Sequence, residues 1–549
     1  MPLSENWATL WEAIAASQPD HIAVVLGDRP IRWRDLDDRA SRLATAFTAH
    51  GIGQDAKVAQ LMYNCPEYLE SSYAAFKVRA STVNVNYRYL APEIVHVVAD
   101  SDAEVLVFHG CFASVVAEAV RSLPSLRLLV QVDDGDGDGV ALLAGASEYE
   151  QLLRSGPPAP PIERSGDDAL LLYTGGTTGL PKGVVWRHAD LFGALAFTGY
   201  ASMGIAVPQT AAEVGRVASE LNAAGSSPVN LTCPPLMHGT ALFLAMSTFV
   251  LGGTVVLLGS RRFDPVELLR LIERERVTQL SIVGDAFARP IVAELERAAA
   301  DGHACDLSSV GRIVSTGATL SAPLKTALMR RAPNAVVIDM IGASEGGPFA
   351  LSITAPGQDV AETARFMATP ATAVFDPDTW ELIAPGAGRA GVLAASGPMP
   401  SSYYKDPVKT AETFREIGGV RYTIPGDFAL VDADGTVHLL GRGSVCINTG
   451  GEKVYPEEVE VAARTHPDVE DCIAVGMPDG RYGQIVTLVV SAVDGHSVDP
   501  VALTDHMRAL IASFKVPRRV VCVDRVYRSP SGKADYRWAR EVASPSPGA

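Results

Sequence analysis

The residues best suited to chemistry lie in a glycine- and threonine-rich segment, LLLYTGGTTGLPKG, at residues 170–183. An apolar run there is followed by Thr174, Gly175, Gly176, Thr177, Thr178 and Lys182. Glycines let successive backbone N–H groups turn toward an anion, threonines add donors, and lysine adds positive charge. The pattern predicts a phosphate-binding loop, with a flexible surface turn as the alternative. It is not a Walker loop, because no Gly-Lys-Ser/Thr follows at the required spacing.

Seven further motifs follow this loop in order along the chain. They lie at residues 234–239 (PPLMHG), 315–320 (STGATL), 341–345 (IGASE), 425–427 (PGD), 441–442 (GR), 449–460 (TGGEKVYPEEVE) and 530–533 (PSGK). Together they resemble the motifs of the adenylate-forming superfamily, which includes acyl-CoA synthetases, luciferases and peptide-synthetase adenylation domains. The resemblance covers nearly the whole chain. It implies that ATP and a carboxylic acid give acyl-AMP and pyrophosphate, and that CoA then attacks to give acyl-CoA and AMP.

The resemblance also implies how ATP and Mg²⁺ are bound. Glu345 would hold the Mg²⁺ that bridges the phosphates, next to a phosphate-contacting hydroxyl on Ser344. The ATP- and AMP-binding residues implied by the motifs are Thr174, Gly175, Gly176, Thr177, Thr178, Lys182, Gly317, Ala318, Asp339, Ile341, Gly342, Ala343, Ser344, Asp427, Arg442 and Lys533. Among these, Gly317 and Ala318 would line the adenine, with Asp339 near its amino group. Asp427, assisted by Arg442, would accept hydrogen bonds from the ribose hydroxyls.

Four residues are expected to be catalytic: Lys533, Glu345, Thr177 and Lys182. A carboxylate and a triphosphate repel each other, so attack at the α-phosphorus needs cations placed where negative charge grows. By composition alone a C-terminal lysine is usually a solvated surface charge. The PSGK context instead predicts that Lys533 supplies charge to the transition state.

The acid and CoA sites are implied by the same motifs. His238 and Gly342 would line the acyl site, although a structural histidine is the alternative for His238. Gly450 and Gly451 would let the thiol arm of CoA pass, and Ser444 stands at the position of a hinge. The sequence departs from the common pattern in three places: Ile341 replaces an adenine-stacking Tyr, Ser444 replaces Asp or Lys, and Gln484 replaces Glu. None of these changes removes a group that binds phosphate or magnesium, but they leave efficient CoA transfer open.

The elements that must position these residues are predicted to form an α/β fold. AVVLGDRPIRW is typical of a hairpin, and Leu36, Ala40, Leu43, Ala44 and Phe47 fall on one face of a helix that should stop at Gly51. Short β-rich runs (TVVLLG, RIVSTG, VVIDMIG) alternate with helical patterns, which favours largely buried sheets. Residues 241–259 carry no charge, but the glycines at 252 and 253 divide them into pieces too short to span a membrane.

Two domains are expected, since 549 residues exceed one ordinary core. Residues 1–442 would form a large N-terminal adenylate-forming domain, with β-sheets flanked by helices, that binds ATP and the acid. Residues 443–549 would form a small mobile α+β lid carrying the catalytic lysine. In the lid, strands are expected at CIAVGMPD and QIVTLVVSAV, followed by a helix that buries Leu503, Met507, Leu510, Ile511 and Phe514. The acidic DDGDGDG segment at 133–139 superficially suggests a calcium loop but is expected to be a solvated turn, because Gly145 stands at the twelfth position, counted from Asp134, where such a loop requires Glu.

Composition bounds the partners and the compartment. With 46 basic and 63 acidic residues, the net charge of −17 disfavours nucleic-acid binding. Seven scattered cysteines without a CxxC pair argue against a zinc site or a disulfide framework and favour a reducing cytoplasm. The N-terminus has no basic segment of a signal peptide, and no transmembrane segment is expected. The oligomeric state, a homodimer included, is left open.

Which acid is activated depends on weaker signals. The segments SIVGDAFARPIV and GRGSVCINTGGEKV resemble the actinobacterial subgroup acting on bulky polycyclic acids, of the steroid or terpenoid type; a fatty or aromatic acid is the alternative. Two other functions are kept in view. One is a ligase that hands acyl-AMP to another enzyme or carrier, and the other is a non-catalytic nucleotide-binding protein. Release of pyrophosphate that depends on an acid would separate the enzymes from the binding protein.

Overall fold

A computed structural model describes residues 3–134, 140–174, 180–318, 320–358, 360, 365–442, 445, 447–449, 452–479, 482–511, 513–528 and 532–544. The chain divides into two compact units. The first comprises Met1–Pro348, Ser352–Ala364 and Gly397–Phe414, and the second comprises Phe349–Leu351, Arg365–Ser396 and Arg415–Ala549. β15 (Gly346–Thr354) contributes residues to both units.

One sheet of the first unit ends at the predicted phosphate loop. Its strand order is β19 (Ser402–Tyr403), β9 (Lys182–Arg187), β8 (Ala169–Thr174), β4 (Ser81–Asn84), β3 (Lys57–Leu61), β5 (Val105–His109), β6 (Leu128–Val132) and β7 (Ala146–Glu148). The strands from β8 to β7 pair in parallel, whereas β9 pairs antiparallel with both β8 and β19. The segment rich in glycine and threonine begins at the end of β8 and continues to the start of β9.

A second group of strands in this unit carries the adenine motifs predicted from the sequence. Its order is β2 (Arg29–Arg32), β1 (Ile22–Leu26), β11 (Thr254–Leu257), β10 (Val229–Thr232), β12 (Gln279–Ile282), β13 (Arg312–Thr316) and β14 (Val336–Ala343). Apart from the β1–β2 hairpin, neighbouring strands pair in parallel. The predicted hairpin and the predicted strands at TVVLLG, RIVSTG and VVIDMIG are confirmed. Parallel strands bring their carboxyl ends to one edge, where the STGATL and IGASE motifs begin.

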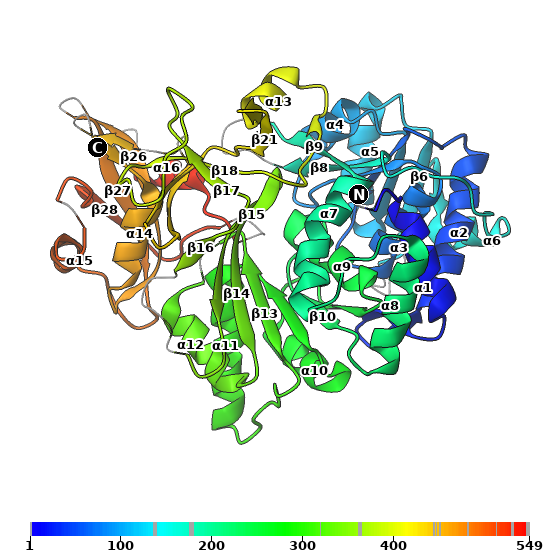
Figure 1. Cartoon of the computed structure of the whole chain (residues 1–549), viewed down its shortest axis with the longest axis horizontal. Helices are drawn as coiled ribbons and strands as arrows, with labels where there is room; N and C mark the ends of the chain where they lie inside the picture. Colours follow the sequence, from blue (N-terminus) through cyan, green and yellow to red (C-terminus); the bar gives the residue numbers. More distant parts are fainter. Residues whose placement is uncertain are drawn as a thin grey trace. The chain divides into compact units, whose positions relative to one another are not determined.

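Helices cover both groups of strands (Figure 1). They are α1 (Trp7–Ser17), α2 (Trp33–Ala49), α3 (Pro66–Lys77), α4 (Ala91–Asp100), α5 (Ala113–Ala119), α6 (Tyr149–Arg154), α7 (His188–Gly199), α8 (Ala211–Ala223), α9 (Gly239–Val250), α10 (Pro265–Glu275), α11 (Gly284–Ala300), α12 (Ala322–Arg331) and α13 (Pro407–Thr413). The predicted apolar face of α2 is buried in the largest core cluster. Helices α10, α11 and α12 share a separate core with strands β12 to β14.

The uncharged stretch at residues 241–259 forms core structure. It divides into α9 and β11, joined by a turn in which Gly252 adopts a φ of +68°. An added Cβ at Gly252 would lie 2.5 Å from Ala218 Cβ, so the turn requires glycine there. In the part of the chain that the structure describes, no helix is long and apolar enough to cross a membrane.

The second unit begins with antiparallel strands. These are β16 (Phe366–Ala368), β23 (Thr436–Arg442), β22 (Asp427–Val431), β18 (Gly391–Ala395), β21 (Val420–Thr423) and β20 (Phe414–Ile417) in spatial order, with β17 (Thr372–Phe375) also paired to β18. Phe375, Val392, Ala394 and Ile424 form their small core. Asp427 and Arg442 are cross-strand partners at one end of the β22–β23 pair.

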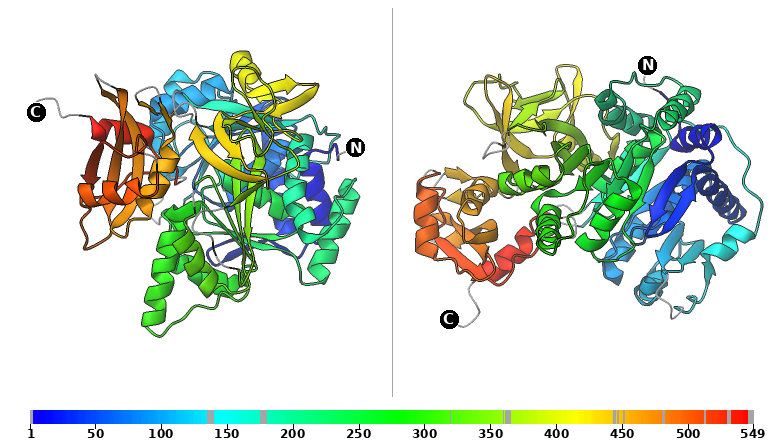
Figure 2. Two further views of the ribbon diagram at one scale, coloured as in Figure 1. Left: turned by 60° about the vertical axis from the view of Figure 1, so that its left-hand side comes forward. Right: turned by 90° about the horizontal axis from the view of Figure 1, so that it is seen from below.

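The C-terminal part of this unit is a separate small sheet. Strands β25 (Glu452–Val454), β24 (Ile447–Thr449), β27 (Gly483–Ala492) and β26 (Val469–Asp479) lie in that order, with β28 (Arg519–Val523) on β27. Figure 2 shows this sheet with its helices α14 (Pro456–Arg464), α15 (Pro500–Arg508) and α16 (Tyr536–Ala543). Alternate residues of β26 point to opposite faces: Cys472 and Ala474 pack with α14 and α15, whereas Ile473 and Val475 pack with α16. The strands predicted from CIAVGMPD and QIVTLVVSAV are therefore confirmed.

The predicted lid helix is shorter than its apolar pattern suggested. Leu503 and Met507 are buried as expected, but α15 ends at Arg508, with Ala509 as its C-cap. Leu510 is 53% exposed and Phe514 is 38% exposed, so the expectation that they face the core is wrong. The apolar spacing continues for one turn past the end of the helix, so burial was predicted for residues that the helix does not include.

Candidate active site

The predicted phosphate loop is flanked by two well-ordered strands. Thr174 ends β8 and Lys182 begins β9, and these two residues are directly opposite each other in the antiparallel register. The predicted loop residues Gly175, Gly176, Thr177 and Thr178 lie outside the described residues. The Lys182 ammonium donates to the Asp406 carboxylate at 2.5 Å, and this hydrogen bond, with the backbone N–H of Lys409, lowers the pKa of Asp406.

A buried asparagine joins the loop to the predicted acyl motif. Asn84, at the end of β4, donates to the carbonyl oxygens of Tyr173 at 2.8 Å and Met237 at 2.7 Å. Its own side-chain oxygen accepts from the Tyr173 N–H at 2.6 Å. Asn84 thus brings the residue before Thr174 close to the residue before His238. The sequence carried one signal for this role, a polar residue at the end of a short β-rich run.

His238 is the N-cap residue of α9 and is half-buried. The segment before it is held by Asn64, which donates to the Pro234 carbonyl at 3.1 Å and accepts from the Leu236 N–H at 2.7 Å. The acid-binding role of His238 stays a prediction. Its backbone, however, is fixed by side chains that come from elsewhere in the fold.

The predicted magnesium ligand follows β14 directly. The Tyr403 hydroxyl donates to Glu345 Oε1 at 2.5 Å, and the Trp186 indole donates to the Ser344 carbonyl oxygen at 2.9 Å. Trp186 lies on β9, which starts at Lys182, and Tyr403 lies on β19, which pairs with β9. The structure therefore brings the lysine end of the predicted phosphate loop and the predicted magnesium ligand onto one framework.

The predicted adenine residues lie where β13 and β14 end. Gly317 adopts a φ of +87°, a left-handed conformation that favours glycine, and Thr316 donates to the Met340 carbonyl at 2.9 Å across the two strands. Ala318, Ile341 and Ala343 are half-buried, whereas Gly342 is exposed. An added Cβ at Gly342 would meet only the Thr316 hydroxyl oxygen, at 3.7 Å.

Asp339 lies further inside the strand. It is 5% exposed and forms an ion pair with Lys325 of α12, which is 2% exposed. Burial raises the pKa of Asp339, and Lys325 opposes that rise. The carboxylate thus has a cationic partner within the fold, and its role near the adenine amino group stays a prediction.

The remaining predicted residues belong to the second unit. Asp427 and Arg442 meet across β22 and β23, and Lys533 is exposed. The hinge residue Ser444 and the tunnel glycines Gly450 and Gly451 lie outside the described residues, as do 135–139 of the acidic turn. The roles predicted for them stay predictions, as does the domain boundary placed after residue 442.

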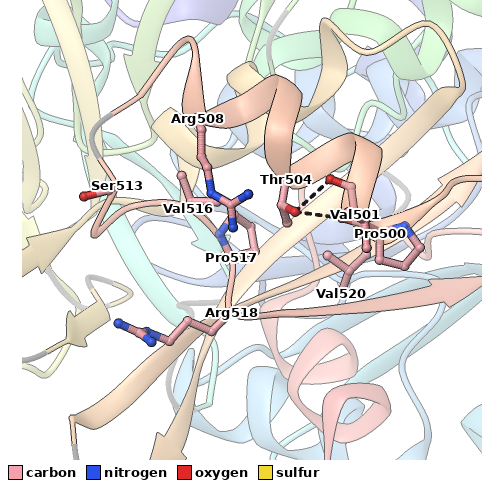
Figure 3. A pocket seen from close by; sticks show the side chains of 9 residues that line it. All are labelled: Pro500, Val501, Thr504, Arg508, Ser513, Val516, Pro517, Arg518 and Val520. Atoms are coloured by element: carbon pink, nitrogen blue, oxygen red, sulfur yellow. Dashed lines mark hydrogen bonds between the residues drawn. The ribbon is translucent and has the colours of Figure 1, made fainter.

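Away from the predicted site, the described residues offer a cavity but no metal-binding cluster. No group of three or more His, Cys, Asp or Glu side chains could hold a metal ion within the described ranges. A cavity of about 520 Å³ opens in the second unit (Figure 3), lined in part by Thr504, Arg508 and Arg518. The Thr504 hydroxyl there donates to the carbonyls of its own helix, and none of the predicted site residues lines the cavity.

Two family models and several full-length relatives match the chain. Residues 11–404 match the AMP-binding enzyme family, and residues 458–533 match the AMP-binding enzyme C-terminal domain. The chain is 40% identical over 542 residues to a medium/long-chain-fatty-acid–CoA/3-oxocholest-4-en-26-oate–CoA ligase of Mycolicibacterium smegmatis, covering 99% of this chain and 97% of the relative. It is 39% identical over 539 residues to a 3-oxocholest-4-en-26-oate–CoA ligase of Rhodococcus rhodochrous, covering 98% and 95%. The medium-chain acyl-CoA ligase Mig of Mycobacterium avium is 40% identical over 548 residues, with 97% of each chain covered.

Solved structures agree on the fold. The anthranilate CoA ligase AuaEII in complex with anthranoyl-AMP gives a TM-score of 0.81 at 21% identity, covering 99% of this chain and 98% of that one. ATP-bound MatB from Rhodopseudomonas palustris gives 0.77 at 23% identity, covering 97% and 98%. These similarities establish a shared fold. They confirm the predicted α/β class with a large N-terminal and a small C-terminal part.

Proposed function

The chain belongs to the AMP-binding enzyme family and is an AMP-forming acid–CoA ligase, and on this premise we propose that the acid it activates is bulky and polycyclic, of the steroid or terpenoid type. ATP, CoA and the acid are its small-molecule substrates, and Mg²⁺ is standard for the family. The steroid assignment is supported by full-length relatives near 40% identity that are named as 3-oxocholest-4-en-26-oate–CoA ligases. A medium-chain fatty acid is the second candidate, favoured by the Mycobacterium avium relative.

One observation carries the adenylation half of the proposal. Lys182 is the first residue of β9 and pairs with Asp406, and Glu345 is held by Tyr403 of β19, which pairs with β9, so a cation for the phosphates and a carboxylate for a metal ion share one framework. The donor set fits magnesium, which is bound in nucleotide sites through one or two carboxylates together with substrate phosphates. Bound there, Mg²⁺ would neutralise phosphate charge. In our proposal Lys182 grips the phosphates, Ser344 contacts them, and His238 and Gly342 face the acid.

Lys533 supplies the positive charge for attack of the acid on the α-phosphorus. Fixed charges placed where charge develops stabilise the transition state more than the ground state. Asp427 and Arg442 bind the ribose in this proposal. The Gly450–Gly451 pair then lines the path by which CoA reaches the acyl group.

The substrate is tested by pyrophosphate release and by mass spectrometry of the thioester. We expect kcat/KM for 3-oxocholest-4-en-26-oate to exceed that for decanoate and for ferulate. Gly342→Leu should fill the space above Gly342 and lower kcat/KM for the steroid acid by roughly tenfold or more, with a smaller loss for decanoate. A preference for decanoate or ferulate, or equal losses for both acids in the variant, would contradict the steroid assignment.

CoA is tested as acceptor by a single-turnover experiment. Acyl-AMP is formed first without CoA, and CoA is then added in excess. We expect acyl-AMP to be consumed as acyl-CoA appears. Acyl-AMP that persists would instead favour transfer to another enzyme or carrier.

We also propose a cytoplasmic location and leave a homodimer as a state to be measured. Support for the compartment comes from described cysteines that are free thiols, namely Cys65, Cys233, Cys305, Cys472 and Cys522. Fractionation of the native cells would test the location. Light scattering of the purified chain would give the oligomeric state.

A further inference from the structure

We propose that Tyr403 is a positioning residue for the magnesium–nucleotide complex, acting through the carboxylate of Glu345. The inference deepens the proposed function and rests on it, since it takes Glu345 as the ligand of the metal. It adds a residue that none of the sequence motifs singled out. The hydroxyl of Tyr403 would hold one carboxylate oxygen so that the other is presented to the metal in a fixed direction.

The tyrosine itself is held rigidly. It is 6% exposed, and its backbone N–H donates to the Thr410 hydroxyl at 2.9 Å. On either side of it, the N–H of Ser401 donates to the Val185 carbonyl and the N–H of Tyr404 donates to the Gly183 carbonyl, each at 2.8 Å. Its ring packs 6.0 Å from that of Phe414. A ring fixed in this way gives its hydroxyl a fixed position.

The acceptor needs such a partner. Glu345 lies in a turn after β14, and a glutamate side chain has three rotatable bonds whose freedom must be lost when it binds a metal. A hydrogen bond to a carboxylate is charge-assisted and stronger than one between neutral groups. Partners of this kind orient metal-binding carboxylates, and removing them typically lowers metal affinity by about 10–100-fold.

The location of Tyr403 gives the bond a wider consequence. Three residues later, Asp406 receives the Lys182 ammonium, so one short segment contacts both the lysine and the carboxylate predicted to meet the phosphates and the metal. Both contacts depend on β9, because Lys182 is its first residue and β19, which carries Tyr403, pairs with it. The segment therefore sets the spacing between the two charges before any nucleotide binds.

The test measures nucleotide binding without turnover. A non-hydrolysable ATP analogue, α,β-methylene-ATP, is titrated calorimetrically in the absence of acid, once with Mg²⁺ and once in EDTA. We expect wild type to bind more tightly with Mg²⁺. Tyr403→Phe should lose most of this Mg²⁺-dependent gain in affinity, a decrease of up to about tenfold in affinity with Mg²⁺, while its affinity in EDTA is unchanged.

Tyr404→Phe is the matched control. The Tyr404 hydroxyl donates to Asp102 at 2.9 Å, so this variant removes a hydroxyl group from the neighbouring residue without touching Glu345. It should keep the wild-type gain. In a Glu345→Gln background, Tyr403→Phe should have no further effect, because the carboxylate through which it acts is gone. Glu345→Asp, which draws the carboxylate back from the hydroxyl, gives a second route to the same loss should Tyr403→Phe not fold.

Several results would overturn the inference. These are an unchanged magnesium gain in Tyr403→Phe, an equal loss in Mg²⁺ and in EDTA, an additive loss on top of Glu345→Gln, or a wild type without any gain. Failure of the proposed function is distinct from these. A wild type that binds the analogue with a magnesium gain but releases no pyrophosphate with any acid refutes the ligase assignment, while the effect of Tyr403 on that gain still stands.

Discussion

The two compact units hold their charged groups in different ways. In the first unit, Lys182 and Glu345 each have a polar partner in a fixed place, Asp406 and Tyr403 respectively, at 2.5 Å. In the second unit, Glu457 of α14 is packed against the backbone of Gly441. An added Cβ on Gly441 would overlap its carboxylate, and no described residue hydrogen-bonds to Glu457 Oε2.

The electrostatics follow this difference. Burial, followed by the charges of Glu460 and Asp427, raises the pKa of Glu457 to about 8, and the hydrogen bond from Tyr536 opposes the rise. The first unit, by contrast, gives each of its two predicted site charges a polar partner in a fixed place. The second unit buries the carboxylate of Glu457, at a cost in free energy, beside the residues where a hinge is predicted. Contacts of low stability are expected where a fold must move.

The largest effect should come from Lys533, which separates chemistry from binding. Lys533→Ala should slow acid-dependent pyrophosphate release by about 10²–10³-fold, because it removes charge needed mainly in the transition state. Affinity for α,β-methylene-ATP should change by less than about threefold. Rapid-quench kinetics and calorimetry measure the two quantities.

Arg537→Ala provides the control for this change. It removes a positive charge four residues further on, from a side chain that is 88% exposed and pairs with Glu541. Its adenylation rate should match wild type. Equal losses of rate and of nucleotide affinity in Lys533→Ala would show that this lysine binds the nucleotide in the ground state, and its role specific to the transition state would fail.

Much of the fold could be predicted from local pattern. The β1–β2 hairpin, the apolar face of α2 and the division of the uncharged stretch into α9 and β11 all follow from spacing and glycine placement. The end of α15 could not be predicted, because apolar spacing continues past the last residue that has helical hydrogen bonds. Burial of Leu510 was therefore expected in error.

The site was predictable only as far as its motifs reach. Ser344, Glu345 and Lys182 were predicted from the sequence as site residues, but the partners of Glu345 and Lys182 come from more than 50 residues away in the chain. Tyr403 and Asp406 lie in an ordinary-looking segment, SSYYKDP, and only the pairing of β19 with β9 reveals them. Asn84 was missed for the same reason. The local sequence does not indicate which distant strand edge a residue will contact.

A second prediction concerns the buried carboxylate of α14. The pKa of Glu457 is raised in the folded chain from an ordinary value near 4.5 to about 8, so the folded state binds more protons than the unfolded state between those pH values. Local stability should therefore fall as pH rises from 5 to 8. Glu457→Gln should remove this slope and make α14 more stable than wild type at pH 8.5, by several kcal/mol.

Hydrogen exchange of α14 amides at pH 5.5 and 8.5, corrected for intrinsic rates, measures this slope. Glu458→Gln is the matched control, since it changes the adjacent carboxylate, which pairs with Lys515 at 2.9 Å. That variant should keep the wild-type dependence. A flat profile in wild type would mean that the second unit pairs its carboxylates as fully as the first.

The smallest effect is expected at Asp406, and its sign decides what the paired charges of the first unit do. The Asp406 carboxylate must give up the Lys182 ammonium when phosphates arrive, and its own charge repels them. Asp406→Asn removes that competition but keeps an oxygen for the Lys409 N–H, which caps α13. Affinity for α,β-methylene-ATP in EDTA should rise by about threefold, within the range measured for exposed ion pairs.

Asp102→Asn removes the same charge from the neighbouring pair with Lys405, which lies at 2.7 Å, and should leave the affinity unchanged. If Asp406→Asn instead weakens binding, the carboxylate aims the lysine rather than competing for it, and the first unit depends on its pairs for geometry as well as for charge balance.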